Sequence, residues 1–416
     1  MTADRRRPDH RSDRRGERHT VRPGELRHVV THLITPLLMC IGMGFAYLGA
    51  FADPSPHHLP VAVVGTDTHA QVLAQTLNGK AHGELEARTV PDRPAAVDLL
   101  KKQEIFGAYL AGGNGSTGQK ATGGATTAGR ATATPELLVA TAGSDTSATV
   151  VQKVFTPLAA QQGAPLKVTD VAPTAKDDPT GQGIFFLLVA LSIGSYASVA
   201  VIGGAGAVLA MRIRAALAIG TSFVVGIIGT LFAGPVFHLV DHGLAGLWGM
   251  AWLYSAGILL IGTGLHTFLK RWTTLGVMAL FVMLNFTSSG GIFRPEMQNG
   301  FFASLHSFWN GAGFVEGTRS HVYFDGDGLV GHVWTLVAWL FAGLLMVGVA
   351  ALTEKRRRTA EAEAVANAGA VAAAALAATV PERGAGHAAG QVSECPVMQA
   401  GAGAGEEEEM EEAVGV

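Results

Sequence analysis

The sequence has little charge and almost no cysteine. Only 15% of its 416 residues are charged, whereas about a quarter is usual in a soluble globular domain. Its two cysteines, Cys40 and Cys395, lie in an early apolar segment and near the C-terminal end. They cannot cross-link a domain folded between them, and no Cys/His spacing is typical of a metal site. The composition excludes an ordinary soluble domain and a disulfide-stabilised one, and we expect neither a metal nor a cofactor.

Catalytic motifs are also missing. The sequence contains no GxxxxGK[ST] phosphate-binding loop, so the chain does not hydrolyse ATP by that route. No carboxylate pair or His/Asp/Ser cluster is placed at one membrane depth, and we therefore do not expect an enzyme. The charged residues of 53–182 are scattered rather than gathered in a basic stripe, which argues against nucleic acid as a partner.

Long apolar runs are what the sequence has in quantity. Residues 183–293 are almost unbroken apolar sequence, and each piece has the roughly 20 residues that a helix needs to cross about 30 Å of hydrocarbon. The predicted membrane helices lie at 29–51, 184–210, 215–238, 247–268, 273–292 and 331–352. We expect an α-helical polytopic membrane protein with six transmembrane helices and an inserted extracytoplasmic α/β domain.

The distribution of Lys and Arg predicts how the chain is oriented in the lipid bilayer. These residues gather in the Arg-rich segment 1–28, at Arg212 and Arg214, at Lys270 and Arg271, and at 355–358. The alternating loops, 239–247 and 293–330, carry only Arg294 and Arg319. Because Lys and Arg near helix ends stay in the cytoplasm, both termini are predicted to be cytoplasmic. Segment 1–28 is then a disordered basic tail.

The predicted membrane helices have no Asp, Glu, Lys or Arg near their middle. Proton- and sodium-coupled transporters rely on ionisable groups inside the membrane, where such residues are conspicuous. If the chain transports a substrate, we therefore expect the energy to come from another polypeptide.

Strands and helices alternate between the first two predicted membrane helices. Strands are predicted at 59–64, 85–90, 105–110, 136–141 and 166–171, and helices at 69–79, 94–103 and 146–162. This alternation predicts a small α/β or α+β domain at 53–182 with a mostly parallel sheet. The Gly/Ala/Thr/Ser-rich stretch 111–134 is predicted to be a flexible surface insertion.

The last predicted outer loop, 293–330, follows a helix end made of small residues. The run Asn285-Phe-Thr-Ser-Ser-Gly-Gly291 precedes Arg294-Pro295 and then an aromatic-rich stretch that includes Phe308 and Trp309. Trp and Phe prefer the membrane interface, and non-helical backbone is tolerated at that depth only when protein or water covers it. We therefore predict a re-entrant or interfacial hairpin that enters the outer leaflet.

This stretch resembles the last outer loop of ABC transporter permeases of the type-2 exporter class. In that family an Asn…Ser-Ser-Gly-Gly helix end precedes a Pro, an aromatic-rich re-entrant segment and an Arg…Tyr-Phe-x-Gly sequence. The matching residues here are Asn285, Ser288, Ser289, Gly290, Gly291, Pro295, Arg319 and Tyr323. The opening of the outer domain, residues 53–67, is similar to the branch related to phage-infection (Pip-like) proteins, which has a large outer domain after its first helix.

The resemblance implies a permease subunit of an ATP-driven exporter in a bacterial plasma membrane. The expected partners are a cytoplasmic ABC ATPase subunit and either a second copy of the chain or a sister permease. A short cytoplasmic turn at Met211–Arg214 is then expected to contact the ATPase through Arg212 and Arg214. Membrane topology alone explains these two arginines equally well.

A second hypothesis also fits the sequence. A non-transporting receptor or scaffold of the cell envelope, acting through its outer domain, would likewise lack charges in the middle of its membrane helices. The C-terminal tail 353–416 does not separate the two hypotheses. It is Ala-rich and then acidic, and it is predicted to be a frayed helix followed by disorder.

Overall fold

The computed structural model describes residues 23–112 and 134–379. Most of the predicted tail 1–28, nearly all of the insertion 111–134 and the acidic end of the chain lie outside the described residues. Contacts divide the chain into two units, Met1–Arg357 and Arg358–Val416. The first unit contains both a helix bundle and an α/β domain.

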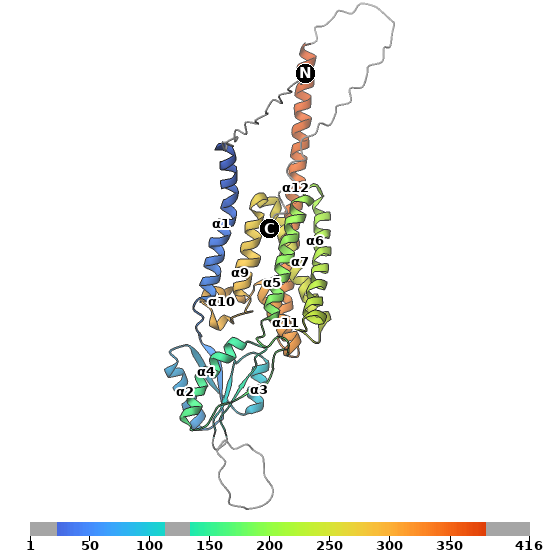
Figure 1. Cartoon of the computed structure of the whole chain (residues 1–416). Coiled ribbons are helices and arrows are strands. Elements are labelled where there is room, and N and C mark those ends of the chain that lie inside the picture. The colour runs from blue at the N-terminus through green and yellow to red at the C-terminus, as the bar shows by residue number, and fades with distance from the viewer. Residues whose placement is uncertain (1–22, 113–133, 380–416) are drawn as a thin grey trace, which may run out of the picture. The chain divides into compact units, whose positions relative to one another are not determined.

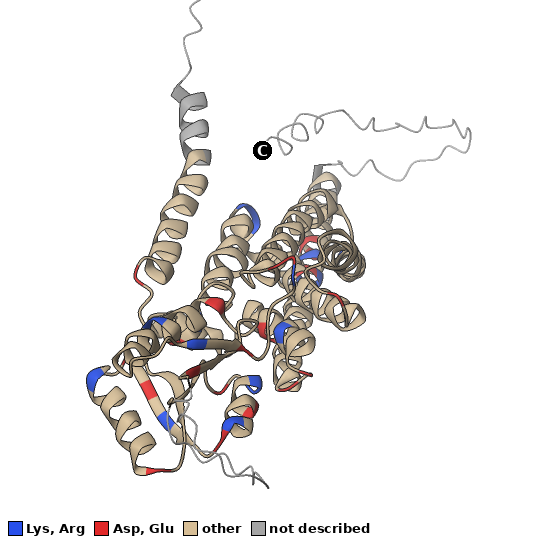
Figure 2. Cartoon of the chain, turned by 60° about the horizontal axis from the view of Figure 1, so that its bottom comes forward, with Lys and Arg blue, Asp and Glu red and all other residues tan. Residues whose placement is uncertain are grey.

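Apolar helices make up the bundle of the first unit (Figure 1). They are α1 (Pro23–Phe51), α5 (Gly183–Gly203), α6 (Met211–Leu231), α7 (Leu244–Leu269), the short helices α8 (Thr273–Met278) and α9 (Leu284–Ser288), and α12 (Leu329–Thr379), which continues past Arg357 into the second unit. Figure 2 shows long stretches of these helices without a charged residue. In the described chain, five segments are long and apolar enough to cross a membrane: Leu33–Phe51, Gly183–Gly203, Met211–Val236, Leu244–Ser288 and Leu329–Leu376. The chain is therefore mostly helical and has the character of a multi-pass membrane protein.

The fourth of these segments, Leu244–Ser288, folds back on itself. A straight helix would place Tyr254 and Asn285, which are 31 positions apart, about 45 Å from each other. Instead, Asn285 Nδ2 lies 2.5 Å from Tyr254 Oη. The reversal falls at Lys270, whose φ of +46° ends α7. The segment therefore has two antiparallel arms: α7, and a second arm in which the π-helix η4 (Ala279–Met283) joins α8 to α9.

One predicted turn is wrong. The predicted turn Met211–Arg214 is the first turn of α6, and the actual connection lies at 204–210, where Gly204 leaves helical geometry with ψ of −83°. The predicted membrane helix 331–352 and the helix predicted at the start of the tail form one continuous helix, α12, which ends at Thr379. The Ala-rich sequence after 352 has a high helix propensity, which explains the extension.

The α/β domain is built on a five-stranded sheet with the order β2-β1-β3-β4-β5. Its strands are β1 (Leu59–Val64), β2 (Leu85–Val90), β3 (Ala108–Leu110), β4 (Glu136–Val139) and β5 (Lys167–Asp170). All pairings are parallel except β3 with β4, where Leu110 lies opposite Glu136. The sheet is thus mostly parallel, as predicted. The segment 113–133, outside the described residues, joins the two antiparallel neighbours β3 and β4.

Helices cover both faces of this sheet (Figure 1). They are α2 (Thr68–Lys80), α3 (Arg93–Lys101) and α4 (Asp145–Gln161). Successive residues of a strand point to opposite faces, so Val61 and Val63 pack with Phe155 of α4, whereas Ala62 packs with Leu100 of α3. Fully burying a side chain such as Phe155 stabilises the domain by about 1.5–3 kcal/mol.

Close approach of α12 to α7 depends on glycine. A Cβ atom at Gly343 would lie 2.7 Å from the Cβ of Leu260 and 3.4 Å from the carbonyl oxygen of Gly257. Small residues at such crossings let helix backbones pack closely in a membrane bundle. At Gly348, five positions further along the same helix, a Cβ would meet nothing within 4 Å.

We therefore predict that Gly343→Leu destabilises the bundle by about 2 kcal/mol or more, because the new side chain forces α12 away from α7. Gly348→Leu is the matched control and is expected to leave stability unchanged. Thermal unfolding of the two variants in detergent measures the difference. Equal unfolding temperatures would contradict this account of the packing.

Candidate functional site

A helical hairpin follows α9 and enters the bundle without crossing it. It consists of α10 (Gly300–His306) and α11 (Asn310–Tyr323), and nearly every residue of α11 is buried. The start of α11 lies beside the middle of α7, because Asn310 Nδ2 donates to the carbonyl oxygen of Tyr254 over 3.2 Å. Its end lies at the start of α7, where His321 Nε2 is 3.0 Å from the carbonyl oxygen of Gly243. Helix α11 therefore spans about 15 Å of the depth of the bundle.

A polar network holds the inner tip of this hairpin. Asn285 Oδ1 accepts a hydrogen bond from the amide of Gly311 over 2.6 Å, and Asn285 Nδ2 donates to Tyr254 Oη. Tyr254 Oη in turn lies 2.5 Å from Ser192 Oγ of α5. The first amides of a helix have no partner within it. Asn285 satisfies one of them at a buried helix start, where leaving it unpaired costs about 1–3 kcal/mol.

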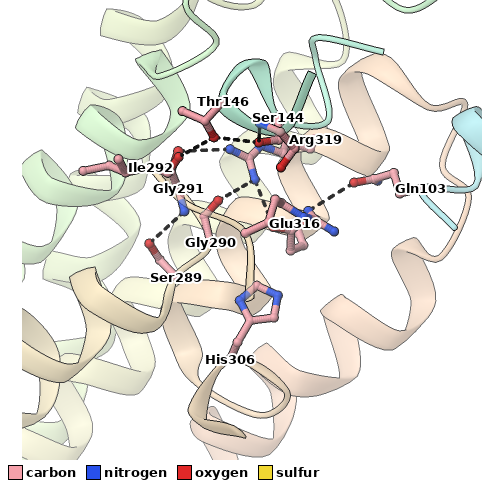
Figure 3. Close-up of polar contacts among 12 residues, drawn as sticks. Gln103, Ser144, Thr146, Ser289, Gly290, Gly291, Ile292, His306, Glu316 and Arg319 are labelled. Atoms are coloured by element: carbon pink, nitrogen blue, oxygen red, sulfur yellow. Dashed lines mark hydrogen bonds and ion pairs between the residues drawn. The ribbon is translucent and has the colours of Figure 1, made fainter. Parts of the chain in front are cut away.

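A buried charge cluster lies at the outer end of the hairpin. The Glu316 carboxylate pairs with Arg294 Nη1 and, over 3.0 Å, with Arg319 Nη1. Arg319 also donates to the carbonyl oxygens of Gly290 and Gly291, over 2.8 and 3.1 Å (Figure 3). Glu316 and Arg319 are each 3% exposed. The cluster therefore joins α11 to the chain that leaves α9.

The charges of this cluster depend on one another. Burial raises the pKa of Glu316, but the nearby guanidinium groups of Arg294 and Arg319 outweigh this and lower that pKa to about 2. Burial lowers the pKa of His306, whose Nδ1 lies 2.9 Å from the carbonyl oxygen of Ser288. The imidazole is thus neutral at pH 7, and Nδ1–H donates to that carbonyl. Glu316 is the ionised centre on which the two arginines depend.

Gly290 is required by both its backbone and its surroundings. Its φ is +73°, a conformation that side chains other than glycine rarely adopt. A Cβ atom there would lie 2.6 Å from His306 Cε1 and 2.9 Å from Glu316 Oε1. The Gly-Gly pair at the end of α9 therefore lets the backbone carbonyls approach Arg319.

The α/β domain contacts the same segment of chain. Arg294 Nη1 donates to Gln103 Oε1 over 3.3 Å, and its guanidinium lies 5.3 Å from the ring centroid of Phe106. Thr146 Oγ1, in the first turn of α4, donates to the carbonyl oxygen of Ile292 over 3.1 Å (Figure 3). Residues 290–294 are thus held by the hairpin and by the domain together. Arg294 contacts both of them, through Glu316 of the hairpin and Gln103 of the domain.

The remaining predicted loop residues have structural roles nearby. Ser288 supplies the carbonyl that accepts from His306, and Ser289 Oγ accepts from the amide of Gly291 over 3.2 Å. Pro295 begins the short 3-10 helix η5 (Pro295–Met297). Tyr323 Oη donates to the carbonyl oxygen of Leu239 over 3.3 Å and accepts from the amide of Ala175. Tyr323 therefore ties the end of α11 to the loop after α6 and to the chain that leaves the α/β domain.

The two predicted ATPase-coupling residues are not equivalent. Arg212 is exposed in the first turn of α6. Arg214 is 3% exposed and pairs with Glu354 of α12, which also accepts from Thr267 Oγ1 over 3.1 Å. Only Arg212 is available to another protein.

Sequence reasoning missed Glu316, Arg294 and His306 as members of the site. One signal was present: Glu316 and Arg319 are the only charged residues between 297 and 324, and they are three positions apart. Charges at that spacing lie on one face of a helix. Nothing in the sequence indicated that Gln103 contacts Arg294 or that Thr146 contacts Ile292, because these contacts depend on how the α/β domain packs against the bundle.

No family model, curated protein or solved structure matches the chain. In the part of the chain that the structure describes, no three His, Cys, Asp or Glu side chains are grouped so that they hold a metal ion. The charge cluster holds the α10–α11 hairpin against the chain after α9, and through Arg294 it also contacts the α/β domain.

We predict that Glu316→Gln destabilises the protein by about 3 kcal/mol, because buried Arg319 loses its counter-charge and buried Arg294 keeps only Glu296, at 3.9 Å. The measurement is thermal unfolding in detergent at pH 7. Glu104→Gln is the control, since its ion pair with Arg88 is largely exposed and is worth less than about 1 kcal/mol. Equal effects of the two substitutions would show that the cluster does not hold the hairpin.

The same cluster predicts a pH dependence. The folded-state pKa of Glu316, about 2, lies below its ordinary value of 4.5. Its contribution is therefore fully present above about pH 5 and is lost as the pH falls toward 2. The difference in unfolding temperature between wild type and Glu316→Gln is expected to be constant from pH 5 to 8 and to shrink in acid. A difference that grows in acid would contradict the assignment.

Proposed function

We propose that this chain is the membrane-spanning permease subunit of an ATP-driven exporter of the ABC type-2 class. The observation that carries the proposal is the α10–α11 hairpin, which enters the bundle to mid-depth and returns to the same end. Two of the residues on which the resemblance to that class rests, Arg319 and Tyr323, lie in the hairpin. Others, including Asn285 and Gly290, contact it from the chain that precedes it. Both ends of the hairpin are fixed by these residues, with Asn285 at its tip and Arg319 at its base.

Six membrane passes are part of this proposal. The folded-back segment Leu244–Ser288 supplies two of them, and the other four apolar segments supply one each. The exposed basic residues at the turn of this segment, Lys270 and Arg271, favour a cytoplasmic location for that turn. The α/β domain and the base of the hairpin are then extracytoplasmic, and both termini are cytoplasmic in a bacterial plasma membrane.

The charge distribution supports an external energy source. In the described chain, one buried ion pair joins Arg214, in the first turn of α6, to Glu354 of α12, and the others join Glu316 of the hairpin to Arg294 and Arg319. Neither arrangement is an unpaired ionisable group of the kind that ion-coupled transporters use. A separate cytoplasmic ATPase, bound to a pair of permease subunits, fits this pattern.

In this proposal the charge cluster couples the outer domain to the transport path. Because Arg294 contacts both Gln103 and Glu316, a shift of the hairpin during transport moves the domain with it. The partner permease is either a second copy or a sister chain. Its substrate passes through the interface between the two subunits.

Affinity purification from native membranes in mild detergent tests the proposal. We expect an ATP-hydrolysing chain to co-purify in stoichiometric amounts and ATP hydrolysis to be measurable in the complex. Reconstituted alone, the chain is expected to accumulate nothing against a gradient. Accumulation driven by a pH gradient, with no ATPase bound, would rule the proposal out.

Arg212 gives a sharper test of the contact with the ATPase. Arg212→Glu is expected to reduce the co-purified ATPase by about tenfold without changing the unfolding temperature, because the side chain is exposed. Arg214→Gln is expected to lower the unfolding temperature instead, because Glu354 loses its buried partner. The ratio of ATPase to permease on a stained gel, together with thermal unfolding, separates the two effects. A lower unfolding temperature for Arg212→Glu would contradict the assignment of Arg212 to ATPase contact and of Arg214 to stability.

A receptor or scaffold of the cell envelope remains the second candidate. It is favoured by the contacts of the α/β domain with residues 292–294, which fit signalling as well as transport. Under that function, no ATPase co-purifies, and a ligand of the outer domain changes the protection of α11 from hydrogen exchange.

A further inference from the structure

A cavity of about 270 Å³ lies beside the turn between α7 and α8. Its walls come from the last turns of α5, from the end of α7 and from α8. The lining residues are Tyr196, Val199, Ala200, Gly204, His266, Lys270, Arg271, Thr273, Thr274 and Val277. The cavity lies far along α7 from Gly243, the residue at which α7 meets the outer end of α11.

The mouth of the cavity carries two cations without counter-ions. Lys270 and Arg271 are exposed, and neither forms an ion pair with any residue that the structure describes. No acidic side chain lines the cavity. The guanidinium of Arg271 lies 5.4 Å from the ring centroid of Trp272, an aromatic residue of the kind enriched at membrane interfaces. The mouth is therefore suited to an anion at the level of the lipid headgroups.

The interior of the cavity is different in character. Val199, Ala200 and Val277 give it an apolar wall, and the hydroxyl groups of Thr273 and Thr274 stand near the basic residues in sequence. The ring of His266 packs against Gly203, where a Cβ atom would lie only 2.6 Å from His266 Cδ2. Glycine at 203 thus lets His266 line the cavity. The combination of a cationic mouth and an apolar wall matches an amphiphile rather than a free ion.

The backbone of Lys270 is a second, independent observation. A lysine occupies a φ of +46°, where glycine is the unstrained choice. Strained backbone that a protein retains is often found at binding sites, where it positions a side chain. Here it lies at the turn after α7, where both Lys270 and Arg271 line the cavity.

We propose that this cavity binds one anionic phospholipid of the leaflet at this end of the bundle. The lipid phosphate interacts with Lys270 and Arg271, and an acyl chain lies along Val199, Ala200 and Val277. Basic pockets between membrane helices recognise anionic headgroups in this way. The site is independent of the proposed transport function, because none of the residues that form the hairpin lines it.

The test is native mass spectrometry of the full chain in detergent, supplemented with equal amounts of phosphatidylglycerol and phosphatidylcholine. We expect one phosphatidylglycerol to be retained per chain, in preference to phosphatidylcholine. The double variant Lys270→Gln, Arg271→Gln is expected to reduce this preference by about tenfold. Inorganic phosphate at millimolar concentration is expected not to displace the lipid, because it lacks the acyl chain.

Two further variants keep the test specific. Ala200→Leu fills the apolar wall and keeps every charge, so it is expected to reduce lipid retention even if the double variant fails to fold. Arg212→Gln removes an exposed basic residue that does not line the cavity, and it is expected to leave the preference unchanged.

Three outcomes would overturn the proposal. The first is retention of phosphatidylglycerol that Ala200→Leu leaves unchanged. The second is an equal loss with Arg212→Gln, which would show a general attraction to basic surface. The third is full displacement by inorganic phosphate, which would identify an anion site without a lipid. These experiments measure lipid retention and not ATP hydrolysis. A negative result would therefore count against the lipid site and not against the proposed transport function.

Discussion

The buried carboxylate of Glu316 is the interaction on which the rest of this end of the molecule depends. Two buried arginines pair with this one charge, and only Arg294 has a further acidic neighbour, Glu296 at 3.9 Å. Through Arg319 the carboxylate fixes the backbone after α9, and through Arg294 it reaches the α/β domain. Burying a carboxylate costs energy, yet Glu316 of α11 connects the hairpin, the chain after α9 and the α/β domain through its two arginines.

Much of the fold follows from the sequence because hydrophobic runs and strand alternation are local signals. The five strands lie within the predicted stretches. The five apolar segments of the structure overlap the stretches that were predicted to be membrane helices. The position of the turn after α5 was less predictable. Arg212 and Arg214 are compatible with a loop as well as with a first helical turn, and the pairing of Arg214 with Glu354 involves residues 140 positions apart.

The candidate site was predictable in outline but not in its chemistry. The small residues from Asn285 to Gly291 and the aromatic residues after them predicted a hairpin, and helices α10 and α11 follow this run. The close approaches at Gly290 and Gly311 were not predicted. What approaches them was not visible, since Asn285 meets Gly311 and Gly290 meets His306 only after the hairpin folds inward. Spacing along the chain does not encode such long-range contacts. The same limit applies to Gln103 and Phe106, which meet Arg294 from a different domain.

The antiparallel pair of β3 and β4 has a consequence for how the α/β domain tolerates change. These strands lie side by side at Leu110 and Glu136, so the chain between them starts and ends at nearly one point. The entropy of closing such a connection rises only slowly with its length, by about 0.6 kcal/mol for each doubling. Related chains are thus free to lengthen or shorten this connection while the sheet keeps its order. An epitope tag inserted between residues 113 and 133 would lengthen this connection without having to separate β3 from β4.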